Sequence, residues 1–275
     1  MSDTTERTFA LVGPGRAGTA LALALVGAGY RAVAVAGRTP DAASTRAVAE
    51  QLGAPAVDVT DAGRAAHLVV LATPDHAIET EAATVGASLR AGALVIHLAG
   101  ARGLDALDPI RSARPDVHVG ALHPLQTLPS GDAGREALRG AWAAVAGPSS
   151  VTELALELGL RPFTVADADR AAYHAAAVVA SNHLVALLGQ VERLADASGA
   201  PFAAFEPLAR AALANAFVLG PAAALTGPVA RGDTASVVAH LDAISDDEQR
   251  AYRALAEAAL RLTGRDDAAL REVLA

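Results

Sequence analysis

Short apolar runs alternate with helical stretches from Thr8 to about Val165, and this alternation restricts the fold more than any other feature of the sequence. Strand-like runs occupy residues 8–12, 32–36, 68–72, 94–98, 117–122, 141–146 and 161–165, and a shorter one covers 56–59. Strands that alternate with helices are typical of a mostly parallel sheet with helices on both faces. We therefore expect an α/β domain with a doubly wound sheet over residues 1–166.

Residues 167–275 lack strand-like patterns and predict a separate helical domain. Helical patterns cover 168–198, 203–219, 233–243 and 246–263, and a short helix is expected after Gly264. Residues 220–233 are rich in Gly and Pro and predict a loop between two of these helices. The most apolar stretch, 171–191, carries several polar side chains, so we expect a buried helix of a soluble protein rather than a membrane span.

The residue types that the chain lacks exclude several kinds of chemistry. All 22 basic residues are Arg, so the chain has no Walker A lysine, no Schiff-base lysine and no lysine proton donor. Without Cys it has no thiolate nucleophile or disulfide, and its His spacing does not predict a metal site. The net charge of -8 argues against a nucleic-acid partner, and the polar, acidic N-terminus is unlike an export signal. We expect a cytoplasmic protein.

A glycine motif follows the first predicted strand directly. It has the G-x-G-x-x-G spacing, a helix is expected from its fourth residue, and its members are Gly13, Pro14, Gly15, Arg16, Ala17 and Gly18. In such motifs the first Gly permits a tight turn, the second lets the backbone approach a pyrophosphate, and the third lets the helix pack on the strand. The helix N-terminus also favours an anion. These six residues are predicted to bind a dinucleotide.

The end of the second predicted strand indicates which dinucleotide binds. Arg38 and Thr39 lie where an acidic residue would bind the adenine ribose 2′-hydroxyl of NAD(H). A guanidinium and a hydroxyl can instead bind a 2′-phosphate, so the predicted cofactor is NADP(H). Thr39, Pro40 and Asp41 also have the residue types of a helix start, and we expect the next helix to begin there.

Two further segments are predicted to reach the same edge of the sheet. Ala72, Thr73 and Pro74 come at the end of one predicted strand and are expected to lie beside the ribose or nicotinamide of the cofactor. His123 follows another predicted strand and can face the same cleft.

Polar residues interrupt the apolar helix expected over 168–198. At about 100° per residue, His174 and Ser181 lie on nearly one face, with Asn182 adjacent. Each could simply hydrogen-bond within a helical core, but a substrate in a cleft would also supply partners. For carbonyl reduction we predict His174 or His123 as the general acid and Asn182 as the residue that orients the carbonyl.

Four segments resemble Rossmann-like proteins that carry the domain of unknown function 2520: 173–177 (YHAAA), 181–182 (SN), 224–233 (ALTGPVARGD) and 123–126 (HPLQ). That family is similar to the 6-phosphogluconate-dehydrogenase-like group, which includes pyrroline-5-carboxylate reductase and ketopantoate reductase. The resemblance implies a Rossmann domain and a helical domain that closes the cleft and often dimerises. It therefore predicts an NADP oxidoreductase that forms a homodimer through the helical domain.

The predicted reaction is hydride transfer from NADPH to a small anionic 2-oxo acid or imino acid, such as ketopantoate. Arg231 is the candidate for binding the substrate carboxylate, although an ion pair with Asp233 is an equal alternative. Thr226, Asn215 and Gln126 complete the predicted substrate-binding residues. Two other functions stay open: hydride exchange between NADP(H) and a deazaflavin coenzyme, and a sensor that binds NADP(H) without turnover.

Overall fold

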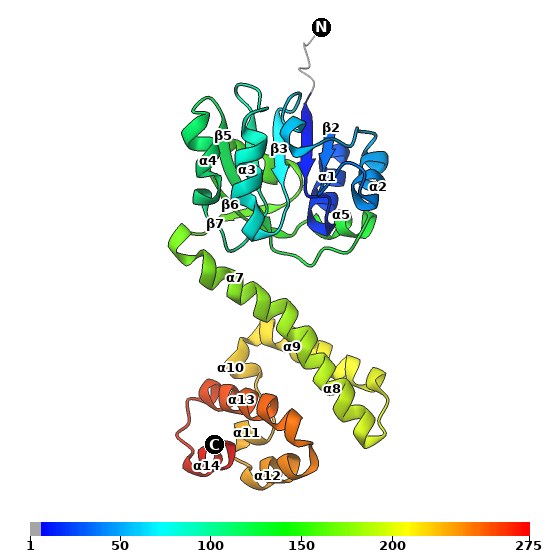
Figure 1. Cartoon of the computed structure of the whole chain (residues 1–275). Coiled ribbons are helices and arrows are strands. Elements are labelled where there is room, and N and C mark those ends of the chain that lie inside the picture. The colour runs from blue at the N-terminus through cyan, green and yellow to red at the C-terminus, as the bar shows by residue number, and fades with distance from the viewer. Residues whose placement is uncertain (1–6) are drawn as a thin grey trace. The chain divides into compact units, whose positions relative to one another are not determined.

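The computed structural model describes residues 7–275 (Figure 1). The chain has two compact units, one that ends at Ser181 and a second, Asn182–Ala275. The boundary predicted after residue 166 lies directly before the short helix η4 (Asp167–Asp169) and stays a prediction.

The first unit is built on one mixed sheet. Its strands, within the described residues, are β1 (Thr8–Val12), β2 (Arg31–Ala36), β3 (Leu68–Leu71), β4 (Leu94–His97), β5 (His118–Pro124), β6 (Trp142–Ala146) and β7 (Arg161–Thr164). They lie in the order β2-β1-β3-β4-β5-β6-β7. Neighbouring strands pair in parallel from β2 to β5, β6 is antiparallel to β5, and β7 is parallel to β6. The predicted fold class is confirmed, and residues 56–59 contribute only a bridge between Ala56 and Val35.

Strand β1 shows why the strands are continuous apolar runs. Phe9 and Leu11 belong to one buried cluster, whereas Ala10 and Val12 belong to a second cluster, because alternate side chains point to opposite faces. Helices cover both faces, so neither set can be polar. The helices of this part are α1 (Arg16–Gly27), α2 (Ala43–Leu52), α3 (Ile78–Gly86), α4 (Asp108–Ala113), α5 (Asp132–Leu138) and α6 (Ser149–Glu157).

Helix α2 begins later than its sequence predicts. Residues 39–41 were expected to start it, but they form a turn in which the Ala42 N–H donates to the Thr39 carbonyl, and the helix begins at Ala43. The turn brings Thr45 under Gly37, where its side chain is fully buried. Residues 39–41 thus form the turn before the helix and not its first residues.

The part after β7 is helical, as predicted. It contains α7 (Arg170–Val178), the π-helical segment η5 (Val179–His183), α8 (Leu184–Ser198), α9 (Glu206–Leu219), α10 (Pro221–Ala224), α11 (Pro228–Arg231), α12 (Thr234–Ala243), α13 (Asp246–Thr263) and α14 (Ala268–Leu274). The predicted 220–233 loop contains the two short helices α10 and α11. In the second unit, Val229, Val237, Leu241, Leu260 and Leu270 form a buried apolar cluster.

Two helical stretches, 167–198 and 202–219, are long and apolar enough to cross a membrane by length and composition alone. None of the most apolar 18-residue window of either stretch is buried within the chain. The expectation of a buried helix at 171–191 is therefore wrong for the single chain. The small apolar side chains of this stretch predict a helix correctly. Their periodicity does not indicate whether residues of the same chain bury them.

Candidate functional site

The glycine turn after β1 packs tightly against the segment after β3. Gly13 has φ +93°, and a Cβ on it would lie 2.6 Å from the carbonyl carbon of Ala72. A Cβ on Gly18 would lie 2.5 Å from the Gly13 carbonyl oxygen. The first and third glycines of the motif are thus required by packing, the first also by its backbone conformation.

Gly15 has a different environment. A Cβ on Gly15 would have nothing within 4 Å, and its φ of -83° is open to any residue. Helix α1 starts at the next residue, so its first N–H groups lie beside this open space. Packing therefore does not explain why the middle residue of the motif is a glycine. An anionic ligand at the helix N-terminus would explain it, because the ligand needs the space that a side chain would fill.

Two buried hydroxyls lie near this turn without a hydrogen-bond partner among the described residues. They are Thr73 Oγ1, after β3, and Thr45 Oγ1, beneath Gly37 at the end of β2. A buried polar group without a partner destabilises a fold by about 1–3 kcal/mol, so each hydroxyl favours a ligand that completes its hydrogen bonds. Arg38, which follows Gly37 directly, is exposed and can reach a ligand from solvent.

The strand order places these groups at a switch point. β1 lies between β2 and β3, so the connections after β1 and β3 leave on different sides of the sheet. Ligands of open α/β sheets bind in the crevice at the carboxyl ends of such strands. The predicted cofactor residues of the glycine turn and of the 72–74 segment are thus brought together at this edge.

A second cluster lies at the carboxyl ends of β4 and β5 and the start of α7. The Nδ1 of His123 is 2.7 Å from the hydroxyl of Tyr173, a hydrogen bond between β5 and α7. The ring of His174 is 6.0 Å from that of His123, in an edge arrangement. The Tyr173 ring also contacts Phe163 of β7, at 5.8 Å. The two predicted His candidates therefore lie side by side.

His97, at the end of β4, organises the loop that follows. Its Nδ1 accepts the Ala99 N–H at 3.2 Å, and its Nε2 lies 3.0 Å from the Gly103 carbonyl oxygen and therefore donates to it. Both nitrogens are used, and burial lowers the pKa of His97 to about 4, helped by the charge of Arg170. His97 is a neutral structural residue that fixes the 98–103 loop.

Two glycines of that loop make room for the cluster. A Cβ on Gly100 would lie 2.7 Å from His174 Cδ2 and 2.8 Å from His123 Nε2. A Cβ on Gly103 would lie 2.7 Å from the carboxyl carbon of Asp167. The loop thus passes directly under both imidazoles and the start of the helical region.

Burial governs the protonation of the pair. It lowers the pKa of His123 to about 4, with further lowering by His174, Arg170 and His97. It raises the pKa of Tyr173, while Arg170 acts in the opposite direction. At neutral pH the imidazole is therefore uncharged and the phenol keeps its proton.

Sequence reasoning did not select Tyr173, Arg170, Gly100 or Gly103 as site residues. A signal was present in the spacing of Asp167, Arg170 and Tyr173, which are each three residues apart and lie on one helix face. The glycines gave no signal of their own, because only the tertiary structure shows what a Cβ would meet.

The other predicted residues lie elsewhere. Gln126 is exposed, and its Oε1 accepts the Thr127 N–H at 2.9 Å, within its own loop. Asn182 lies in η5, Asn215 and Thr226 are exposed in the second unit, and Arg231 ends α11 with its guanidinium 4.0 Å from Asp233. The substrate-binding roles of these residues stay predictions.

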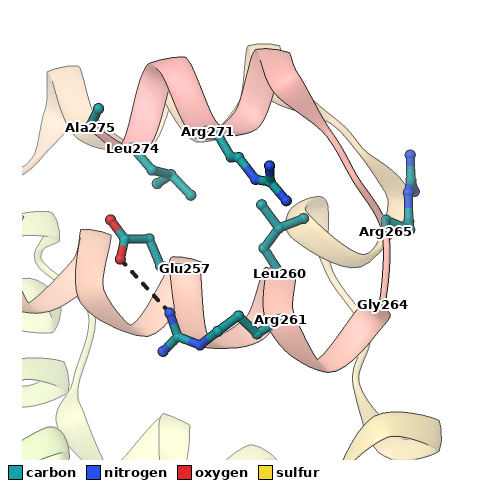
Figure 2. A pocket seen from close by; sticks show the side chains of 8 residues that line it. All are labelled: Glu257, Leu260, Arg261, Gly264, Arg265, Arg271, Leu274 and Ala275. Atoms are coloured by element: carbon teal, nitrogen blue, oxygen red, sulfur yellow. Dashed lines mark ion pairs between the residues drawn. The ribbon is translucent and has the colours of Figure 1, made fainter.

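Two cavities formed by described residues lie away from these clusters. One, of about 500 Å³, lies in the second unit (Figure 2), and its three arginines are each paired with an acid: Arg261 with Glu257, Arg265 with Asp267 and Arg271 with Asp266. The other, of about 330 Å³, is lined by residues such as Arg7, Tyr30 and Glu157, which bond to one another. No residue predicted for the site lines either cavity. Among residues 7–275 no group of three His, Asp or Glu side chains could hold a metal ion.

The architecture matches known families in both parts of the chain. Residues 4–124 match a Rossmann-like domain, and residues 143–259 match the domain of unknown function 2520, DUF2520. The chain is therefore a Rossmann-like protein with a C-terminal DUF2520 domain. No curated protein sequence matches it.

Solved structures share the fold over nearly the whole chain. BF3122 of Bacteroides fragilis, provisionally assigned as an NADP oxidoreductase, is 25% identical with a TM-score of 0.78, over 93% of this chain and 98% of that one. Protein TM1727 of Thermotoga maritima is 24% identical, with a TM-score of 0.65 over 97% and 98% of the two chains. A reductive aminase of Aspergillus terreus, solved with NADPH and ethyl-5-oxohexanoate, is 19% identical, with a TM-score of 0.66 over 99% and 100%. The chain thus has the fold of NAD(P)-dependent oxidoreductases.

Proposed function

We propose that the protein is an NADP(H)-dependent oxidoreductase that reduces the C=O or C=N bond of a small anionic 2-oxo or imino acid. The observation that carries this proposal is the contrast between the three motif glycines. Gly13 and Gly18 are required by packing, whereas Gly15 faces open space at the N-terminus of α1. The match to BF3122 supports the same cofactor class.

The residues around the turn fit the predicted dinucleotide. The turn and the N-terminus of α1 would bind the pyrophosphate, and the buried Thr73 hydroxyl would bond to the ribose or nicotinamide end. Arg38 and Thr39, both exposed after β2, would bind the 2′-phosphate that distinguishes NADP(H). When bound, the nicotinamide supplies the hydride.

Tyr173 and His123 would supply the proton. We assign the hydrogen bond between them as donation from the phenol to Nδ1, so the ring proton of the neutral imidazole is on Nε2. Gly100 passes beside Nε2, where any side chain would collide with the ring. His123 is only partly buried, and a substrate heteroatom would approach Nε2 from its exposed side. The substrate heteroatom would take the proton from Nε2, and Nδ1 would take the phenolic proton in its place. Tyr173 is left as phenolate and later regains a proton from water.

Binding and turnover separate this function from its alternatives. Calorimetry with NADPH and NADH should show tighter binding of NADPH, and NADPH absorbance should report turnover with a panel of 2-oxo and imino acids. Tyr173→Phe should reduce turnover by about 10²- to 10⁴-fold and leave NADPH affinity unchanged. Tight binding of NADPH without turnover of any compound would instead indicate a sensor. Failure to bind either nicotinamide cofactor would exclude the proposal.

The exposed apolar helices support a homodimer. In the second unit the side chains of Val185, Leu208, Phe217 and Val218 are 69%, 68%, 84% and 80% exposed. Large apolar side chains as exposed as these are typical of an interface, and stable interfaces bury more than about 1,000 Å². A second copy of the chain would cover these helices, and the expected species in solution is a dimer.

A further inference from the structure

The first residue of α7, Arg170, is an arginine with no exposed surface. Its Nε donates to Asp167 Oδ1 at 3.1 Å. Its two terminal nitrogens, Nη1 and Nη2, are buried and have no hydrogen-bond partner among the described residues. The charge of this buried guanidinium is poorly compensated, because its one ion-pair partner, the Asp167 carboxylate, is largely exposed. A poorly paired buried charge destabilises a fold, so its presence indicates a function other than stability.

The position of Arg170 relates it to the proton-donating pair. Tyr173 is three residues later on the same helix, so the two side chains are neighbours on one face. The 98–103 loop passes close by, because a Cβ on Gly103 would lie 2.7 Å from the Asp167 carboxyl carbon and one on Gly100 would lie 2.8 Å from His123 Nε2. Water is excluded from the guanidinium, so its field on nearby groups is weakly screened.

The charged and titratable groups around the pair come from several elements. They are Asp167 of η4, Arg170 and His174 of α7, His97 of β4 and His123 of β5, with Asp75 and Arg102 acting on His97. Arg170 acts on two of these groups and on Tyr173 itself. It lowers the pKa of His97, of His123 and of Tyr173, in each case as a secondary effect beside burial.

We propose that Arg170 is the built-in cation of this site, a positioning residue that stabilises the phenolate of Tyr173 after its proton has passed through His123 to the substrate. The guanidinium does not contact substrate. It adds to the effect of burial that keeps His97 and His123 uncharged before the reaction, and it compensates the negative charge that the proton transfer leaves on the phenol. This role rests on the proposed function for the transfer itself, but the charge coupling exists without turnover.

The coupling can be measured because the chain has only 3 Tyr and 1 Trp. In a Tyr30→Phe, Tyr252→Phe background, tyrosinate absorbance reports the titration of Tyr173 alone. Arg170→Met removes the charge and keeps an apolar stem, and should raise the pKa of Tyr173. Asp167→Asn removes the negative charge that partly compensates the guanidinium, and should lower the pKa of Tyr173. Opposite shifts from two neighbouring substitutions are not expected from a structural role.

Two controls keep the result interpretable. Arg170→Lys preserves the charge, so the His123 titration followed by NMR should stay near that of the parent, while Arg170→Met should raise the pKa of His123. Fluorescence of Trp142 reports local packing, because its ring is 6.0 Å from Phe163, which contacts Tyr173. If Arg170→Met does not fold, the Asp167→Asn titration decides, since that side chain is 58% exposed.

The proposal is overturned if either folded variant leaves the Tyr173 titration unchanged, or if both shift it in the same direction. Opposite shifts in a protein that turns over no 2-oxo or imino acid would support the coupling and refute only the reaction proposed above.

Discussion

Alanine at each of two motif glycines should separate packing from ligand binding. In Gly18→Ala the new Cβ would lie 2.5 Å from the Gly13 carbonyl oxygen, 2.8 Å from Ala72 Cβ and 3.0 Å from Leu11 Cδ1. The oxygen belongs to the backbone of a tight turn and cannot move far. Overpacking of this kind destabilises by about 1–3 kcal/mol, against about 0.5–1 kcal/mol gained by replacing a helical glycine.

Gly15→Ala should behave differently. At its φ of -83° an alanine gains about 0.4–1 kcal/mol by restricting the unfolded chain, and it loses a similar amount because alanine is a poor N-cap. The net change in folding free energy is therefore near zero. A Cβ in the path of the pyrophosphate would remove a charged hydrogen bond of about 1.5–3 kcal/mol, which corresponds to about 10- to 150-fold weaker NADPH binding.

Thermal unfolding and calorimetry with NADPH test both variants. Gly18→Ala should lower the melting temperature by several degrees, since about 1 kcal/mol corresponds to about 2–4 °C in proteins of this size. Gly15→Ala should melt like the parent and bind NADPH poorly. Parental NADPH affinity in Gly15→Ala would refute the assignment of the open space to a pyrophosphate, and an unchanged melting temperature in Gly18→Ala would refute the packing argument.

Three further predictions concern the cofactor, the histidines and the dimer. Arg38→Ala should weaken NADPH binding by about 10- to 150-fold and leave NADH binding nearly unchanged, whereas Arg111→Ala on α4 should affect neither; equal losses for the two cofactors would remove the 2′-phosphate assignment. Folding lowers the pKa values of His97 and His123 from 6.5 to about 4. As the pH falls, these residues therefore bind protons in the unfolded chain before they do so in the folded one, and the free energy of unfolding decreases between pH 6.5 and about 4. For the fully buried His97 this decrease is on the order of 3 kcal/mol. In denaturant titrations the free energy of unfolding should depend less steeply on pH in His97→Asn than in the parent. An identical pH dependence would contradict the role of burial. Phe217→Glu should convert the dimer to a monomer in light-scattering chromatography, while Leu156→Glu, at an exposed position of α6 in the first unit, should not. A dimer that tolerates Phe217→Glu would place the interface elsewhere.

Most of the sheet could be predicted from the sequence because its signals are local. The central strands β1 and β3 are short apolar runs, since helices on both faces leave no polar side, and each run ends at a turn or helix signal. The start of α2 was predicted too early because Pro and Asp, the residue types at 40 and 41, suit a turn as well as a helix start. The 171–191 helix was expected to be buried because apolar content predicts burial without indicating which chain provides it.

Part of the candidate site could be predicted from the sequence, and part of it only from the tertiary structure. The sequence by itself determined the glycine turn, its place after the first strand and the absence of any lysine acid, because these depend on residue identity and spacing. Only the tertiary structure decided that His123 bonds to Tyr173, fifty residues away, and that Arg170 is buried beside them. Such pairings depend on how β5, α7 and the 98–103 loop pack, and hydrophobic periodicity specifies which face of each element is buried but not which polar side chains meet there.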